Sequence, residues 1–345
     1  MKVALVQQAS FSMAYGGAHL SNESLFAELY RMRHSLMVLA RAEAGVGDLA
    51  STHNGQMSSI GLNHKSICAN RRISFRVVTP GIQMVFEYIE AILMFRPDLV
   101  VLQADEKGFY VSSQIIKACK GRVPVMFLIR MSLGHRLAGL RPQDRLPYLK
   151  MIADCDLSVA VSQAVAEEAK VLGLRNVEHI PISSLAKSML KVRFTSKDDR
   201  KYVLAVNRCP EKGFDVLVRL CSSMPHVQFK IVKGWGTQLT HIAALAAYPN
   251  VTIEHFTEDM NSIYDRSSIT LVPSLWFEGR SRVVSESWAR GVPVVASRIG
   301  GIPEAMFGLP FLIDVPEEAR IVHHASPPII NSKWVNEWQT SITRL

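Results

Sequence analysis

Ten short apolar runs, spread over most of the chain, restrict the folds open to this sequence more than any other feature. Each run is rich in Val, Ile and Leu, and stretches with helical periodicity separate the runs. Such strands, alternating with helices, are typical of parallel sheets that are buried on both faces. The predicted strands are residues 2–7, 35–40, 98–103, 123–129 and 157–162 in the first half, and 202–207, 227–233, 250–256, 268–274 and 292–297 in the second.

Two successive series of such units predict an α/β protein with two Rossmann-like domains. A chain of 345 residues is also long for one hydrophobic core. We expect an N-terminal domain over 1–190, a C-terminal domain over 191–330, and a last helix over 331–345 that packs back towards the N-terminal domain. In doubly wound domains, ligands bind at the carboxyl ends of the strands, so we predict parallel sheets facing an interdomain cleft.

Positive charge is concentrated in the first half of the chain. Residues 1–195 hold 23 Lys and Arg against 15 Asp and Glu, a net charge of +8, whereas residues 196–345 hold 16 against 15, a net charge of +1. An anionic partner fits this half: a phosphorylated or lipid-linked acceptor, or an acidic membrane surface. The basic segment NRRISFR (70–76) is too short to indicate nucleic-acid binding, so we read it as a solvated face.

The cysteines and the apolar segments indicate a cytoplasmic protein. The five cysteines are odd in number and lack any CxxC spacing, which argues against a disulfide framework or a zinc site. The N-terminal apolar run is too short for a signal peptide, and Glu87 and Glu90 interrupt the most membrane-like stretch. We therefore expect a cytoplasmic location, with a peripheral membrane contact through the basic N-terminal half kept open.

Three loops after predicted strands have the residues of a phosphate site. Gly16 and Gly17 precede a helical pattern, where a close backbone approach and free helix N–H groups favour an anion, although a plain turn is as good a reading. Arg208 and Lys212 flank a turn in VNRCPEKGFDVL, and we favour a diphosphate clamp over a surface pair of Lys212 with its neighbouring acid. Gly234, in KGWG, would let the backbone approach a nucleotide or simply form a turn.

The segment WFEGRSRVVSESWARGVPVVASRIGGIPE carries two acids eight residues apart. Ser281 is predicted to cap a helix that begins at Arg282 and Val283, whose N–H groups would face a phosphate. Glu278 would precede this helix and Glu286 would lie on its second turn. Each carboxylate accepts hydrogen bonds from hydroxyls, as a sugar and a ribose on either side of a diphosphate would require.

Together these motifs resemble the retaining glycosyltransferases of the GT-B fold, family 4, also described as glycosyl transferases group 1. VNRCPEKGFDVL resembles the family's R-x-x-x-K-G segment, and PSLWFEGRSRVVSESWARGVPVVASRIGGIPE resembles its E-x7-E segment. YGGAHLSNESLFAELYRMRHSLMVLAR, FRPDLVVLQ and DCDLSVAVSQAVAEEAKVLGL follow in the family's order. The likeness therefore extends over most of the chain.

The resemblance implies a transferase (EC 2.4) that moves a sugar from a nucleotide-diphosphate sugar to an acceptor hydroxyl, with retention, without a catalytic metal and without a cofactor. Carried over by position, the diphosphate-binding residues are Arg208 and Lys212. Glu286 is implied to bind the ribose, and Glu278 to face the donor sugar. The Gly16–Gly17 loop would approach the phosphates.

The chain departs from the family's pattern beside these motifs. Arg280, Ser281 and Arg282 stand where the family has apolar or small residues, and Arg130 stands where a histidine is common, with His135 nearby. We take Arg130 and His135 as candidates on the acceptor side. Two rival functions stay open: a catalytically weak nucleotide-sugar-binding partner subunit, and a GT-B sugar-nucleotide epimerase. The triplet DCD (154–156) is read as a cap at a strand start rather than as a metal site.

Overall fold

The computed structural model describes two compact units of the chain, Met1–Ser183 and Ser184–Leu345. Within them, the described residues are 1–7, 17–41, 73–78, 83–103, 109–181, 196, 199–207, 209–234, 236–255, 257, 259–321 and 328–345. The predicted boundary after residue 190 lies outside these residues. Each unit is described by itself below.

The first unit is built on a seven-stranded parallel sheet with the strand order β3-β2-β1-β4-β5-β6-β7. The strands are β1 (Lys2–Gln7), β2 (Ser35–Arg41), β3 (Ile73–Val78), β4 (Leu99–Gln103), β5 (Val125–Ile129), β6 (Leu157–Ala160) and β7 (Val177–His179). The order reverses between β1 and β4, so the chain moves outward in both directions from the middle of the sheet. Edge strand β3 begins inside the basic segment that we read as a solvated face, so residues 73–76 are part of a strand.

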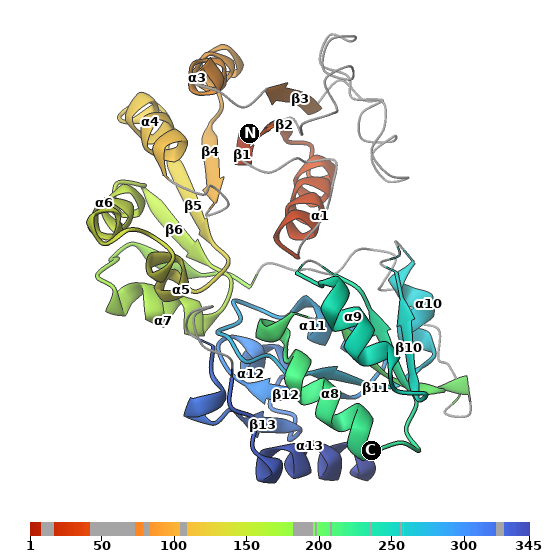
Figure 1. The fold of residues 1–345 in the computed structure, drawn as a ribbon. Coiled ribbons are helices and arrows are strands. Elements are labelled where there is room, and N and C mark those ends of the chain that lie inside the picture. Colours follow the sequence, from red (N-terminus) through yellow and green to blue (C-terminus); the bar gives the residue numbers. More distant parts are fainter. Residues whose placement is uncertain are drawn as a thin grey trace. The chain divides into compact units, whose positions relative to one another are not determined.

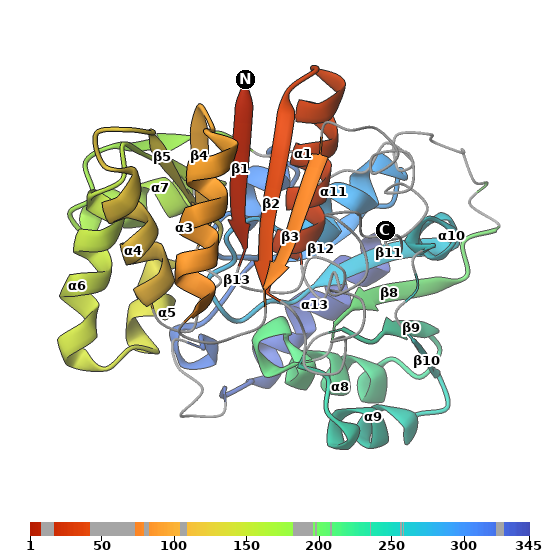
Figure 2. The same cartoon turned by 90° about the horizontal axis from the view of Figure 1, so that it is seen from above.

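Six described helices accompany this sheet (Figure 1): α1 (Gly17–Arg31), α3 (Gln83–Phe95), α4 (Tyr110–Cys119), α5 (Leu133–Ala138), α6 (Pro142–Ala153) and α7 (Gln163–Val171). Helices α3, α4 and α6 lie side by side, as their mutual contacts and both ribbon views show (Figure 2). Buried residues of α1, β1, β2, β4, β5 and β6 form a hydrophobic core in this unit.

The second unit contains a six-stranded parallel sheet with the order β10-β9-β8-β11-β12-β13. Its strands are β8 (Tyr202–Val206), β9 (Phe229–Val232), β10 (Val251–Glu254), β11 (Ser267–Val272), β12 (Val294–Arg298) and β13 (Leu312–Asp314). The strand order reverses between the neighbours β8 and β11. In open α/β sheets, the carboxyl ends of the strands at such a reversal are where ligands bind.

Helices cover both faces of the second sheet: α8 (Phe214–Ser223), α9 (Leu239–Ala246), α10 (Met260–Asp265), α11 (Arg282–Ala289), α12 (Ile302–Ala305) and α13 (Ser332–Arg344). Side chains of β11 alternate between the two faces. Ile269 and Leu271 join the core under α8, α9 and α13, whereas Val272 joins the core under α11 and α12. This two-faced burial explains why the strands read as near-continuous apolar runs.

The last helix, α13, belongs to the core of the second unit. Trp334, Trp338 and Ile342 lie at helical spacing and are at most 6% exposed, and they pack in the same cluster as α8. Burial of each such side chain stabilises a fold by about 1.5–3 kcal/mol. The apolar face of this helix is therefore buried within its own unit. That the helix also packs back towards the N-terminal domain stays a prediction.

The prediction of an α/β protein with two Rossmann-like units is confirmed, and every one of the ten predicted strands is present. Among the described residues, no helix is long and apolar enough to cross a membrane.

Candidate functional site

The loops that follow β8 and β11 meet at the carboxyl edge of the second sheet. After β8, a short 3-10 helix (Pro210–Lys212) leads to Gly213, which has a φ of 80°. A Cβ atom at Gly213 would collide with the carbonyl oxygen of Pro273, which follows β11. The backbone N–H of Leu275 also donates to the carbonyl of Glu211 (2.9 Å). Gly213 therefore allows a close approach that no other residue type would permit.

A buried ion pair joins these two loops. The ammonium group of Lys212 contacts Oε1 of Glu278, and the Ser274 hydroxyl donates to the same oxygen (2.7 Å). The Lys212 ammonium also lies 5.0 Å from the centre of the Trp276 ring, within range of a cation–π interaction. Glu278 is 7% exposed, so its carboxylate has little contact with water. The ammonium group of Lys212 and the hydroxyl of Ser274 stabilise its charge instead.

The pKa of Glu278 reflects two opposed effects. Burial alone would raise the pKa of this carboxyl, but the charge of Lys212 and the hydrogen bonds from Lys212 and Ser274 bring the pKa below its ordinary value. Glu278 is therefore ionised at neutral pH. Its carboxylate can accept hydrogen bonds, and it cannot act as a proton donor there.

The loop after β12 is packed against the same acid. Gly300 has a φ of 55°, and a Cβ atom at this position would collide with the backbone of Glu278. The N–H of Gly301 donates to the carbonyl of Glu278 (2.8 Å). The Gly300–Gly301 pair thus fixes the backbone of Glu278, so three neighbouring strands, β8, β11 and β12, determine where its carboxylate lies.

Glu286 lies on the second turn of α11, as predicted, and its carboxylate is also paired. Oε1 accepts from Nε and Nη2 of Arg282 (3.0 and 2.9 Å), and Oε2 accepts from the hydroxyl of Tyr264 (2.9 Å). Gly291, at a φ of 62°, follows the C-cap residue Arg290 and ends the helix. Ser281 occupies the N-cap position, but its side chain makes no cap hydrogen bond, which corrects the predicted capping role.

The other predicted donor-site residues differ in how far the structure describes them. Arg208 and Gly16 lie outside the described residues. Gly17 is the first residue of α1, and Val283 is the second residue of α11. Gly234 follows β9, and a Cβ atom there would lie 2.9 Å from the Asn207 side chain. Packing against the β8 loop therefore accounts for this glycine without a ligand.

In the first unit, Arg130 directly follows β5 and joins a buried set of amides. Its Nη2 donates to Oδ1 of Asn22 (2.5 Å), and Nδ2 of Asn22 donates to the side-chain oxygens of Gln7 (2.8 Å) and Gln103 (3.1 Å). Gln7 and Gln103 end the adjacent strands β1 and β4. Sequence reasoning missed these three amides. Gln7 and Gln103 carry a signal, a polar residue at the end of an apolar strand, whereas Asn22 lies within α1 and carries none.

His135 lies on α5, near Arg130 in the sequence. Its backbone N–H donates to the hydroxyl of Ser132, the N-cap residue of this helix (3.0 Å). The carboxylate of Glu168 accepts from the same hydroxyl (2.6 Å) and from the N–H of Leu133 (2.7 Å). The backbone N–H groups of Leu133 and His135, at the start of α5, are therefore bonded to side chains of their own unit.

Two further groups with reactive side chains, Cys209 and Asp156, lie in the described residues. Burial, with the nearby Glu211, raises the pKa of the Cys209 thiol to about 12, so this thiol stays protonated at neutral pH. Asp156 accepts from the N–H of Val125 at the start of β5 (2.8 Å), which agrees with the capping role favoured for the DCD triplet. Among the described residues, no three His, Cys, Asp or Glu side chains gather in a group able to hold a metal ion.

Comparison with known proteins places the second unit beside the glycosyltransferases. Residues 200–322 match the family model described as glycosyl transferases group 1. No curated protein matches the chain.

Solved structures match over the whole length of the chain. Anabaena Alr3699/HepE in complex with UDP-glucose has 19% identity and a TM-score of 0.69, with 100% of this chain and 90% of that chain covered. A glycosyltransferase from Rickettsia africae has 14% identity and a TM-score of 0.66, with 91% and 84% covered. At these identities the likeness concerns the fold, and the chain has the two-unit α/β fold of these proteins, GT-B.

Proposed function

We propose that this protein is a glycosyltransferase that moves a sugar from a nucleotide-diphosphate sugar to an acceptor hydroxyl with retention of configuration. Three findings support the proposal: the family match over residues 200–322, the GT-B fold, and the site at the carboxyl edge of the second sheet. HepE, which shares the fold, has been solved with UDP-glucose.

The observation that carries the proposal is the buried Lys212–Glu278 pair at the reversal of strand order. Departure of the sugar leaves a diphosphate with increased negative charge, which a fixed cation stabilises more in the transition state than in the ground state. Lys212 is that cation in our proposal, together with Arg208. Glu278 accepts a hydrogen bond from a hydroxyl of the donor sugar, and Glu286 from the ribose.

The proposed transfer needs no protein base, since the departing phosphate can take the proton of the acceptor hydroxyl. It also needs no cofactor, and we propose that it proceeds without a catalytic metal. Cations and backbone N–H groups would then carry the full task of stabilising the leaving group.

A panel of nucleotide-diphosphate sugars tests this function. Purified protein is incubated with each donor, and free sugar, free nucleotide and transferred sugar are measured with and without simple hydroxylated acceptors. We expect release or transfer of sugar from at least one donor, and weaker nucleotide-diphosphate binding by Glu286→Ala. Donor binding without any release would favour a partner subunit without catalytic activity, and conversion of the donor into an epimer would favour an epimerase.

We also propose that the first unit contacts an anionic membrane surface at the cytoplasmic side, through the C-terminal end of α3. Leu93 and Met94 are 49% and 74% exposed there, and Leu93, Arg96 and Arg122 line one hollow between α3 and α4. Exposed apolar side chains beside cations fit a surface of acidic lipids. Flotation with phosphatidylglycerol vesicles tests this contact: Met94→Glu should abolish binding, and equal binding by both proteins would exclude this surface.

A further inference from the structure

The carboxylate of Glu286 is held by side chains from two helices of the second unit. Arg282 precedes Glu286 by one turn of α11 and donates twice to Oε1, and Tyr264 of α10 donates once to Oε2. Tyr264 is fully buried and Glu286 is 8% exposed. Burial, reinforced by the charge of Glu286, raises the pKa of Tyr264 well above its ordinary value, so its hydroxyl is a permanent donor.

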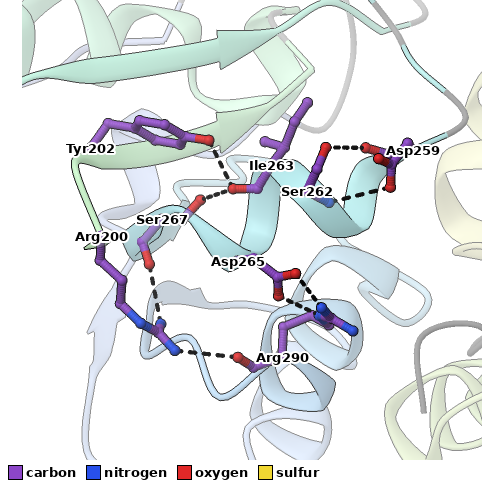
Figure 3. Close-up of polar contacts among 8 residues, drawn as sticks. All are labelled: Arg200, Tyr202, Asp259, Ser262, Ile263, Asp265, Ser267 and Arg290. Atoms are coloured by element: carbon purple, nitrogen blue, oxygen red, sulfur yellow. Dashed lines mark hydrogen bonds and ion pairs between the residues drawn. The ribbon is translucent and has the colours of Figure 1, made fainter. Parts of the chain in front are cut away.

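The helix that carries Tyr264 is fixed at both ends (Figure 3). At its start, the Asp259 side chain accepts from the N–H of Ser262 (3.3 Å). Near its end, the carbonyl of Ile263 accepts from the hydroxyls of Tyr202 (2.9 Å) and Ser267 (2.7 Å). The bonds of Asp259 and Ser267 are local to the helix, whereas the bond from Tyr202 ties the end of α10 to β8.

A second connection joins the end of α10 to the end of α11. Asp265, the last residue of α10, forms a two-fold contact with the guanidinium of Arg290, the C-cap residue of α11 (Figure 3). The Arg290 side chain is 3% exposed, so this ion pair is shielded from water. The helix that donates to Glu286 and the helix that carries Glu286 are therefore held in one arrangement.

These contacts determine how many further hydrogen bonds Glu286 can accept. A carboxylate has about four acceptor positions, two on each oxygen. Oε1 is occupied by two N–H donors of Arg282, and Oε2 by the single hydroxyl of Tyr264. Counted over the described residues, one acceptor position remains, and it lies on Oε2.

We propose that Tyr264 and Arg282 position Glu286 so that its carboxylate binds one hydroxyl of the donor's ribose, rather than two neighbouring hydroxyls together. This inference rests on the proposed donor-binding role of Glu286. Arg282 is a specificity-determining residue in this arrangement, because its guanidinium occupies the oxygen that a second hydroxyl would need. Tyr264 is a positioning residue that acts through Glu286.

Calorimetric titration with UDP, and with its 2′-deoxy and 3′-deoxy analogues, tests the proposal. A hydrogen bond to a charged group is worth about 1.5–3 kcal/mol, or a loss of about 10- to 150-fold in affinity. We expect one deoxy analogue to bind wild-type protein at least tenfold more weakly than UDP, and the other to bind within about threefold of it. Equal large losses for both analogues would overturn the proposal.

Two variants assign the effect to these residues. Arg282→Leu frees Oε1 and should make both deoxy analogues bind more weakly than UDP. Tyr264→Phe should reduce the discrimination between the two analogues while it leaves the affinity for pyrophosphate unchanged. Tyr202→Phe is the matched control, since it removes a hydroxyl that bonds to the same helix without touching Glu286.

Thermal unfolding of each variant separates a local effect from loss of the fold. Discrimination that persists unchanged in folded Tyr264→Phe and Arg282→Leu would also overturn the proposal. If wild-type protein binds none of UDP, GDP and ADP, the donor-binding function fails as well. Binding of UDP with equal losses for the two analogues contradicts this inference alone.

Discussion

Replacement of Lys212 by methionine tests the site most directly, because Lys212 has both a structural and a proposed catalytic task. The change removes the ammonium group and keeps an unbranched apolar stem beside Trp276. Glu278 then remains 7% exposed with its counter-ion gone. Removal of one partner of a buried ion pair typically costs about 3–5 kcal/mol. Since whole domains are stable by about 5–15 kcal/mol, we expect a large fall in the urea midpoint of the second unit.

A second substitution separates stability from chemistry. In the double variant Lys212→Met/Glu278→Gln, neither charge of this pair is left, so most of the lost unfolding free energy should return. Turnover should fall by about a hundredfold or more in Lys212→Met, as when a donor to a developing charge is removed, and should stay low in the double variant. Lys212→Arg, which keeps the positive charge, is the control for stability.

The pH dependence of stability gives an independent measure of the same pair. The pKa of Glu278 is lowered in the folded protein, so the ion pair contributes stability above the ordinary carboxyl pKa of about 4.3. That contribution is lost as the pH falls through the lower, folded-state pKa. In Lys212→Met, burial without the counter-ion raises the pKa of Glu278 above its unfolded value, so the sign reverses: the variant should gain stability as the pH falls through that raised pKa, where wild-type protein loses it.

Two results would refute this reasoning. If Lys212→Met costs less than about 1 kcal/mol and Glu278→Gln restores nothing, the two side chains do not form a buried ion pair of the strength expected. If Lys212→Met loses about 3–5 kcal/mol of unfolding free energy, as expected, but keeps more than about a third of wild-type turnover, Lys212 does not stabilise the leaving group.

Two further substitutions test the packing around the site. Gly300→Ala should lower turnover at least tenfold, because its Cβ would displace the backbone of Glu278, which follows β11. Gly121 has a similar positive φ but no atom within 4 Å of its added Cβ. Gly121→Ala should therefore lower the unfolding free energy by only about 1 kcal/mol and leave activity intact. Arg290→Met should destabilise the second unit by about 3–5 kcal/mol in urea titrations, since Asp265 loses its shielded partner. The ion pair of Arg298 with Asp314 is open to water, since the two side chains are 51% and 82% exposed. Arg298→Met should therefore change the unfolding free energy by less than about 1 kcal/mol. Equal effects in either matched pair would contradict the packing described.

The strand pattern predicted most of the fold because buried parallel strands have a strong and local signal. Strands β1 and β8 begin at the predicted residues, since apolar side chains on both faces of a sheet leave no polar interruption. The strands that the pattern missed are β3, β7 and β13, and all three lie in outer parts of their sheets. β7 and β13 have only three residues each, and β3 contains an arginine, so none forms a long apolar run.

The sequence predicted that Lys212 and Glu278 would share one edge of the second sheet, because both follow strands of a parallel sheet, but it did not predict their pairing. Their roles toward a ligand stay predictions, as does that of Glu286, which was placed on the helix after β11. The contacts among them depend on loop conformations, such as the positive φ of Gly213 and Gly300, that a sequence pattern does not specify. Tyr264 was missed for a related reason, since a buried tyrosine in a short helix is indistinguishable from a core residue until its hydroxyl is located.

Both acids of the site already have a cation in the second unit, Lys212 for Glu278 and Arg282 for Glu286, and this arrangement has a consequence for the proposed transfer. A bound diphosphate competes with Glu278 for the charge of Lys212, because a single ammonium group has three donors to share between them. As the sugar departs and the diphosphate gains charge, the attraction of Lys212 to the diphosphate increases, and its hold on Glu278 weakens. In the proposed transfer, Glu278 would then become a stronger acceptor for a hydroxyl of the donor sugar. Arg282 would meet no such competition at the ribose, so Glu286 would keep one geometry throughout. The two acids would then take unequal parts: Glu278 would respond to the reaction, and Glu286 would hold the nucleotide in place.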